Sequence, residues 1–125
     1  RIESKSVVKP GGRSVFRGVV HVGPDAKKCK SSVSCTALHL GEDCRSDTYP
    51  QVELKNGSAE LEHESSVLQV GEEQLLYLRS RGIDTEAARR MIVGGFVEPF
   101  TQALPLEYAV EFNRLIELEI ENGVG

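Results

Sequence analysis

The sequence predicts a mixed fold in which β-structure comes first and helices follow. Before residue 71, short runs alternate apolar and polar residues with a period of two, and turn signals separate them. After Gly71 the apolar residues recur at helical spacing instead. We therefore expect two regions, with residues 1–70 in β-structure and residues 71–125 in helices.

The expected strands are residues 14–22, 32–40, 49–55 and 58–70. Turn residues separate them, and Asn56-Gly57 before the last strand is a strong tight-turn dipeptide. The turns recur at roughly 12–18 residues, which fits both a sandwich and a β-solenoid. No strict sequence repeat is visible, so periodicity alone leaves both architectures open.

Three helices are expected in the second region. The first spans residues 72–80 and ends at Arg81-Gly82, a typical C-cap. Asp84 is a good N-cap for the second helix, and Gly94-Gly95 weakens that helix near its middle. Pro105 suits the first position of the third helix.

Composition excludes several classes of protein. The chain has 125 residues, 39% of them hydrophobic and 27% charged, as expected of a globular domain. No apolar run approaches the roughly 20 residues of a membrane helix. Residues 58–125 carry thirteen acidic residues against five basic ones, and the basic residues of the first half are scattered, so we expect no nucleic acid and no membrane as partner. Three cysteines spaced C-x5-C-x8-C fit reduced thiols in a cytosol-like compartment.

One short motif, Leu61-Glu62-His63-Glu64, combines an imidazole with two carboxylates. Strand alternation places His63 on the apolar face and Glu62 and Glu64 on the other face. One interpretation is a buried His63 that is satisfied by one hydrogen bond beside a solvated acidic edge. The other is a metal site, which needs a local bulge to bring both faces together.

Cys35 alternates with Val33 and Ala37 on an apolar face. It is therefore either a small buried hydrophobe or a thiolate ligand. A hydrolase that uses Cys35 and His63 is not indicated, because no orienting residue or oxyanion element is recognisable. The sequence has no Gly-rich phosphate loop and no zincin helix, so we expect neither an enzyme nor a nucleotide-binding chain.

Several stretches, taken together and in order, resemble the SufB/SufD family of iron–sulfur cluster assembly scaffold proteins, and the helical tail resembles the SufB branch more than SufD. They cover nearly the whole chain. These stretches are Gly12-Arg13-Ser14, Phe16-Arg17-Gly18, Ser46-Asp47-Thr48-Tyr49-Pro50, Leu61-Glu62-His63-Glu64, Glu73-Gln74-Leu75, Tyr77-Leu78, Arg81-Gly82-Ile83, Ile92-Val93, Gly95-Phe96 and Leu104-Pro105-Leu106-Glu107.

The resemblance implies a fold, a function and partners. Residues 1–70 would form the last rungs of a right-handed parallel β-helix, and residues 71–125 its C-terminal helical region. The chain would belong to a scaffold subunit of the Suf machinery that holds a nascent iron–sulfur cluster. The helices would dock a SufC-type ATPase, and the β-helix would meet a SufD-like or second SufB-like subunit. The location would be the cytoplasm, or the plastid stroma in a eukaryote.

The resemblance also implies site residues. Cys35 matches a cysteine near the SufB–SufD interface, and Glu62, His63 and Glu64 match a Glu-His-Glu stretch implicated in building the cluster. We therefore expect Cys35 and His63 to bind the transient cluster, with Glu62 and Glu64 as further metal ligands. Many members have Asn-Tyr-Thr-Gln-Cys-Asp around the cysteine, so the match of Cys35 rests on its spacing to His63. The alternative is a purely structural β-solenoid interaction module without metal, in which Cys35 and His63 are core residues.

Overall fold

The computed structural model describes residues 1–121, and the fraying that the sequence suggests for residues 122–125 lies outside this range. The chain divides into two compact units, Arg1–Leu68 and Gln69–Gly125. The order of elements, β then α, confirms the mixed fold class. The assignment of residues 1–70 and 71–125 as functional domains stays a prediction.

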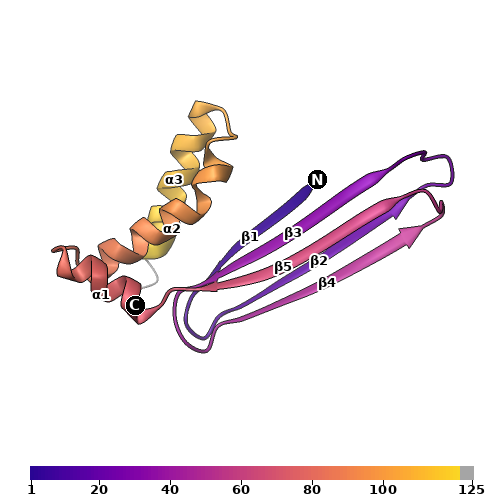
Figure 1. Cartoon of the computed structure of the whole chain (residues 1–125). Helices are drawn as coiled ribbons and strands as arrows, with labels where there is room; N and C mark the ends of the chain where they lie inside the picture. The colour runs from indigo at the N-terminus through magenta and orange to yellow at the C-terminus, as the bar shows by residue number, and fades with distance from the viewer. Residues whose placement is uncertain (122–125) are drawn as a thin grey trace. The chain divides into compact units, whose positions relative to one another are not determined.

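Five strands build the first unit: β1 (Ile2–Val8), β2 (Arg13–Val22), β3 (Lys30–His39), β4 (Arg45–Leu54) and β5 (Glu60–Gln69). They alternate between two sheets as the chain proceeds. One sheet has the order β1-β3-β5, and the other pairs β2 with β4 (Figure 1). The β1–β3 and β2–β4 pairs are parallel. Parallel neighbours within each sheet exclude an antiparallel hairpin sandwich, one of the two architectures that the sequence left open.

The last strand continues this parallel register. The Glu60 amide donates to the Cys29 carbonyl at 2.9 Å, and the Ser66 hydroxyl contacts the Thr36 hydroxyl at 3.3 Å. Both contacts fit a pairing in which each β5 residue lies opposite the β3 residue 30 positions earlier. Because this offset is the same near both ends of β5, no residue is inserted between Glu60 and Ser66.

Two strands differ from expectation at their N-terminal ends. The sequence did not predict β1, because Ser4 and Ser6 interrupt its apolar alternation; pairing with the buried strand β3 nevertheless makes it a strand. β4 begins at Arg45 rather than Tyr49, because its polar first residues pair in register with Arg13 and its neighbours in β2. In both cases, ladder formation overrides weak local β-propensity.

The turns at one end of the sheets are tied together by Asn56. Its amide nitrogen donates to the carbonyls of Pro24, at 3.1 Å, and Ala26, and its oxygen accepts from the Ser58 amide at 3.0 Å. The β4–β5 turn is thereby bonded to the β2–β3 turn that precedes it in the chain. Asn56 is therefore more than a turn former: it satisfies backbone groups of a neighbouring loop.

The second unit contains α1 (Glu72–Ser80), α2 (Thr85–Thr101) and α3 (Leu106–Glu121). As predicted, α1 ends at Arg81 with Gly82 at a positive φ of 85°, and the Asp84 carboxylate caps α2 by accepting from the Ala87 amide at 2.9 Å. Pro105 lies one residue before α3, and its carbonyl accepts the first helical bond, from the Ala109 amide.

Gly94-Gly95 does not interrupt α2, which continues to Thr101 with Pro99 inside it. Val93 and Val97 are buried on either side of the glycines, at 1% and 6% exposure. Packing of this apolar face outweighs the low helix propensity of glycine. Among the described residues, no helix is long and apolar enough to cross a membrane.

Candidate functional site

Strand register brings the two predicted ligands onto neighbouring strands. With the offset of 30 residues, Cys35 on β3 lies opposite Ser65 on β5, and His63 is two positions before Ser65. Residues two apart on a strand share a face, so Cys35 and His63 lie on the same face of the sheet. Strand spacing and rise per residue put their Cα atoms about 8 Å apart.

Cys35 is buried, with 6% of its surface exposed, as are Val33 and Ala37 on the same face. The predicted apolar face of β3 is therefore confirmed. The Cys35 thiol borders a cavity of about 30 Å³ that is lined by hydroxyl side chains from both sheets. Burial raises the pKa of the Cys35 thiol, because desolvation disfavours the thiolate.

His63 lies in a different environment. It is exposed, so the interpretation of a buried histidine held by one hydrogen bond is wrong. The ring borders a separate cavity of about 200 Å³ between the two sheets. Apolar residues of both sheets make up most of the lining: Ile2, Phe16, Val20, Val33, Pro50, Val52 and Leu61. Phe16 lines both this cavity and the cavity beside Cys35.

Glu62 and Glu64 are exposed. The unbroken register between Glu60 and Ser66 provides no bulge. Glu62 nevertheless borders the same cavity as His63, whereas Glu64 does not line it. Within residues 1–121, no three His, Cys, Asp or Glu side chains come together as a metal-binding group. The chain therefore brings Cys35 and His63 to one face, and the assignment of the four residues as ligands stays a prediction.

The other histidines and cysteines have their own partners. His21 is exposed, and its Nδ1 lies 3.1 Å from Glu53. His39 is partly buried, and its Nε2 bonds the Ser46 hydroxyl at 2.8 Å across the two sheets. The Cys44 thiol lies 3.3 Å from the Lys9 carbonyl. Each of the three side chains is thus engaged with a partner other than His63.

Sequence reasoning missed the hydroxyl lining around Cys35. It comes from Ser4, Ser6, Ser14, Ser46, Thr48 and Ser65. All six occupy the inner positions of their strands, where apolar residues are the rule for a solenoid core. The only hint in the sequence is that these Ser and Thr residues lie two positions apart along their strands. The same spacing of polar residues also occurs on a face that is exposed to solvent, so it does not by itself predict a buried hydroxyl lining.

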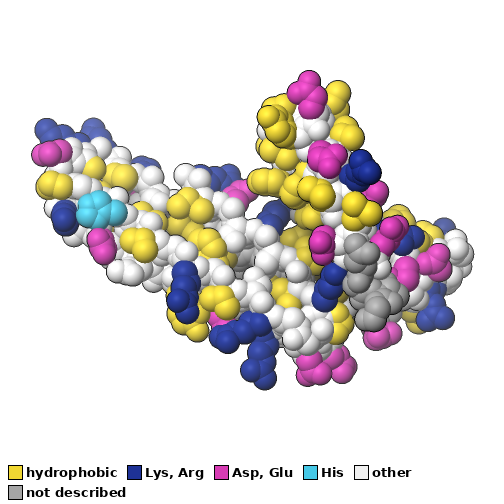
Figure 2. Space-filling view, turned by 180° about the vertical axis from the view of Figure 1, so that it is seen from behind, with side chains coloured by type: hydrophobic (Ala, Val, Ile, Leu, Met, Phe, Trp, Pro, Cys, Tyr) yellow, Lys and Arg dark blue, Asp and Glu magenta, His cyan; other side chains and the backbone are white. Residues whose placement is uncertain are grey.

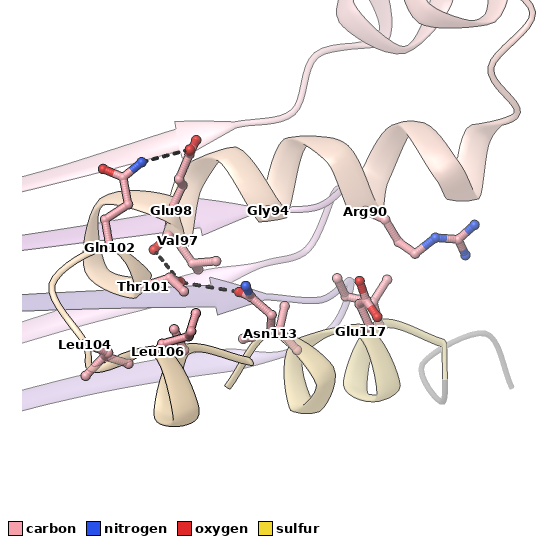
Figure 3. Close-up of a pocket in the computed structure, with 13 residues that line it drawn as sticks. Arg90, Gly94, Val97, Glu98, Thr101, Gln102, Leu104, Leu106, Asn113 and Glu117 are labelled. Carbon is pink, nitrogen blue, oxygen red and sulfur yellow. Dashed lines mark hydrogen bonds between the residues drawn. The ribbon is translucent and has the colours of Figure 1, made fainter. Parts of the chain in front are cut away.

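The second unit offers a groove between α2 and α3 with a volume of about 630 Å³. Its walls are apolar near the middle, where Val97, Ala109 and Ile116 line it. Figure 3 shows Arg90 and Glu117 at one end and Leu104 at the other.

Thr101 joins the two walls of this groove. Its hydroxyl lies 3.2 Å from the Val97 carbonyl and 3.4 Å from the Asn113 side-chain oxygen (Figure 3). Because Thr101 is buried, at 8% exposure, this polar contact lies inside the helix pair and fixes α2 against α3.

Many large apolar side chains of the helices remain exposed. Leu106 is 79% exposed, Tyr108 68% and Val110 61%, all near the start of α3. In Figure 2, hydrophobic side chains gather over the helical hairpin of α2 and α3. A surface of this kind is typical of an interaction site.

Comparison with known proteins identifies the family. Residues 1–96 match the family model described as the SUF system FeS cluster assembly, SufBD core domain. The chain is 53% identical over 124 residues to an iron-sulfur cluster assembly SufBD family protein of Staphylococcus saprophyticus, and 52% identical to those of Staphylococcus haemolyticus and Staphylococcus aureus. Each alignment covers 99% of this chain and 27% of the relative, so the chain spans about a quarter of their length. The chain belongs to the SufBD family of iron–sulfur cluster assembly proteins.

Proposed function

We propose that this chain is part of a SufB-type scaffold subunit on which a nascent iron–sulfur cluster is held, and that it turns over no substrate itself. The cluster is cargo in this proposal. The observation that carries it is the placement of Cys35 and His63 on one face of neighbouring strands, within a chain of the SufBD family. Thiolate and imidazole together suit iron–sulfur chemistry.

The proposed architecture is the end of a right-handed parallel β-helix. Strands that alternate between two sheets and pair only with the strand two positions before or after support this proposal. Each pair of strands would then be one rung, and Asn56 would link the turns of successive rungs. Cys35 and His63 would lie on consecutive rungs.

A second subunit would complete the cluster site. Cys35 and His63 supply two donors, and an iron–sulfur cluster is commonly held by four protein ligands. The edge strands β4 and β5 each have an unpaired side, and Val52 of β4, at 47% exposure, lines the same cavity as His63. Such edges favour association with another subunit. A SufD-like or second SufB-like subunit would fill this role, and Glu62 or Glu64 would ligate metal only with its help.

The helical unit would dock a SufC-type ATPase through the groove between α2 and α3. The exposed apolar residues near the start of α3 support this part of the proposal. The chain itself would bind no nucleotide, because ATP would belong to the ATPase subunit. Free cysteines at positions 29, 35 and 44 support a reducing location, the cytoplasm or the plastid stroma.

The experiment measures iron and acid-labile sulfide on the full-length protein after assembly with its partner subunits under anaerobic conditions. Cys35→Ala and His63→Ala are each expected to lose most of the bound iron and sulfide. His21→Ala is the matched control, because His21 is an exposed histidine of the other sheet that pairs with Glu53. Normal loading in both Cys35→Ala and His63→Ala refutes the cluster site and favours the structural interaction module.

A further inference from the structure

Cys35 borders a small cavity that polar and apolar residues of both sheets line. The cavity of about 30 Å³ is bordered by the hydroxyls of Ser4, Ser6, Ser14, Ser46, Thr48 and Ser65. In the three-stranded sheet, Ser4 on β1 and Ser65 on β5 flank Cys35 from either side. Although Cys35 is only 6% exposed, no hydrogen bond holds its thiol among the residues that the structure describes.

One hydrogen bond spans this cavity from sheet to sheet. The hydroxyl oxygens of Thr48 and Ser65 are 3.3 Å apart. Thr48 belongs to β4 and Ser65 to β5, each the edge strand that comes last along the chain in its sheet. Ser65 is exposed, whereas Cys35 behind it is buried. The Thr48–Ser65 bond therefore lies between the Cys35 thiol and the open edge of the two sheets.

We propose that the Thr48–Ser65 hydrogen bond is a gate that controls access to the Cys35 thiol from the edge of the sheets. While the bond is formed, the cavity has room for a species about the size of a water molecule. Larger thiols and iron complexes with organic ligands reach Cys35 only after the two hydroxyls separate. Thr48 and Ser65 are positioning residues, and the inference rests on the proposed role of Cys35 as a cluster ligand.

The gate is weak enough to open. Its two hydroxyls are neutral, Ser65 is exposed to solvent, and a 3.3 Å separation is at the long end for a hydroxyl pair. A neutral hydrogen bond of this kind shifts an opening equilibrium by about two- to tenfold.

The test follows alkylation of Cys35 in the full-length protein by site-resolved mass spectrometry, with iodoacetamide as the small reagent and a bulky maleimide as the large one. Thr48→Val and Ser65→Ala each remove one hydroxyl of the gate. Thr48→Ser keeps the hydroxyl and serves as the conservative rescue. Thr36→Val is the matched control, because Thr36 borders the same cavity and makes the same 3.3 Å hydroxyl contact, with Ser66, inside one sheet rather than between the sheets.

Both gate variants are expected to raise the maleimide rate at Cys35 about two- to tenfold, while Thr48→Ser and Thr36→Val stay near the parent rate. The iodoacetamide rate should rise less, because the smaller reagent needs less opening. The gate is refuted if Thr48→Val and Ser65→Ala leave both rates unchanged. It is equally refuted if Thr36→Val accelerates the reaction as much, since that result indicates general loosening of the strands.

Iron and sulfide loading of the same variants separates this inference from the proposed function. If Cys35→Ala loads a cluster normally but the gate variants still accelerate alkylation, the cluster role of Cys35 is wrong and the gate stands. If Cys35→Ala loses the cluster and the gate variants alkylate at the parent rate, the cluster role stands and the gate is wrong.

Discussion

Replacing Leu106 by Ala in the full-length protein is expected to weaken binding of the SufC-type ATPase without loss of stability. Leu106 lines the groove between α2 and α3, yet 79% of its surface is exposed. Burying a whole leucine side chain contributes about 1.5–3 kcal/mol, so burying the exposed four-fifths under a partner contributes about 1–2 kcal/mol. Truncation should then raise the dissociation constant about five- to thirtyfold.

Isothermal titration calorimetry of the full-length protein against the ATPase measures this effect. Leu54→Ala is the matched control, because Leu54 is a leucine at 50% exposure in the first unit. Its substitution should leave the ATPase affinity unchanged. Undiminished affinity in Leu106→Ala, or an equal loss in Leu54→Ala, would show that the groove is not the docking surface.

Three further predictions concern stability and pH. Gly18→Ala should lower the free energy of unfolding by about 1–3 kcal/mol in urea titrations, because the added Cβ would lie 2.8 Å from the Phe16 ring; unchanged stability would mean that the ring moves freely. Thr101→Val should lower it by about 1 kcal/mol, since it removes the hydroxyl that contacts Asn113, and no change would show that this contact contributes nothing. The raised pKa of Cys35 means that the unfolded chain loses this proton first; stability should therefore fall as pH rises above roughly 8.5, and Cys35→Ala should show a smaller fall.

Regular alternation explains which parts of the fold were predictable. Val33, Cys35 and Ala37 follow a period of two without interruption, and all three are buried as predicted. The cap residues were equally informative, because Asp84 has a local chemical role that does not depend on the rest of the fold. Where the signal is local and the tertiary environment agrees with it, sequence reasoning succeeds.

The features that the sequence did not predict depend on contacts between distant parts of the chain. β1 forms because β3 supplies a partner strand, and α2 continues through Gly94-Gly95 because its neighbouring valines are buried. Likewise, the exposure of His63 depends on its position on an outer strand, which alternation along one strand does not encode. Whether Cys35 and His63 share a face depends on how β3 pairs with β5. The sequence of one strand does not give this register.

The burial of Cys35 bears directly on how tightly the proposed scaffold would hold its cargo. A cysteine binds metal as the thiolate, so binding at Cys35 must first remove the proton that burial favours. Below the pKa of the thiol, each unit by which the pH falls then reduces the apparent metal affinity about tenfold, because a smaller fraction of the thiol is ionised. A raised pKa on the buried donor therefore weakens the site at neutral pH, and a weak site suits a cluster that is built in order to be passed on.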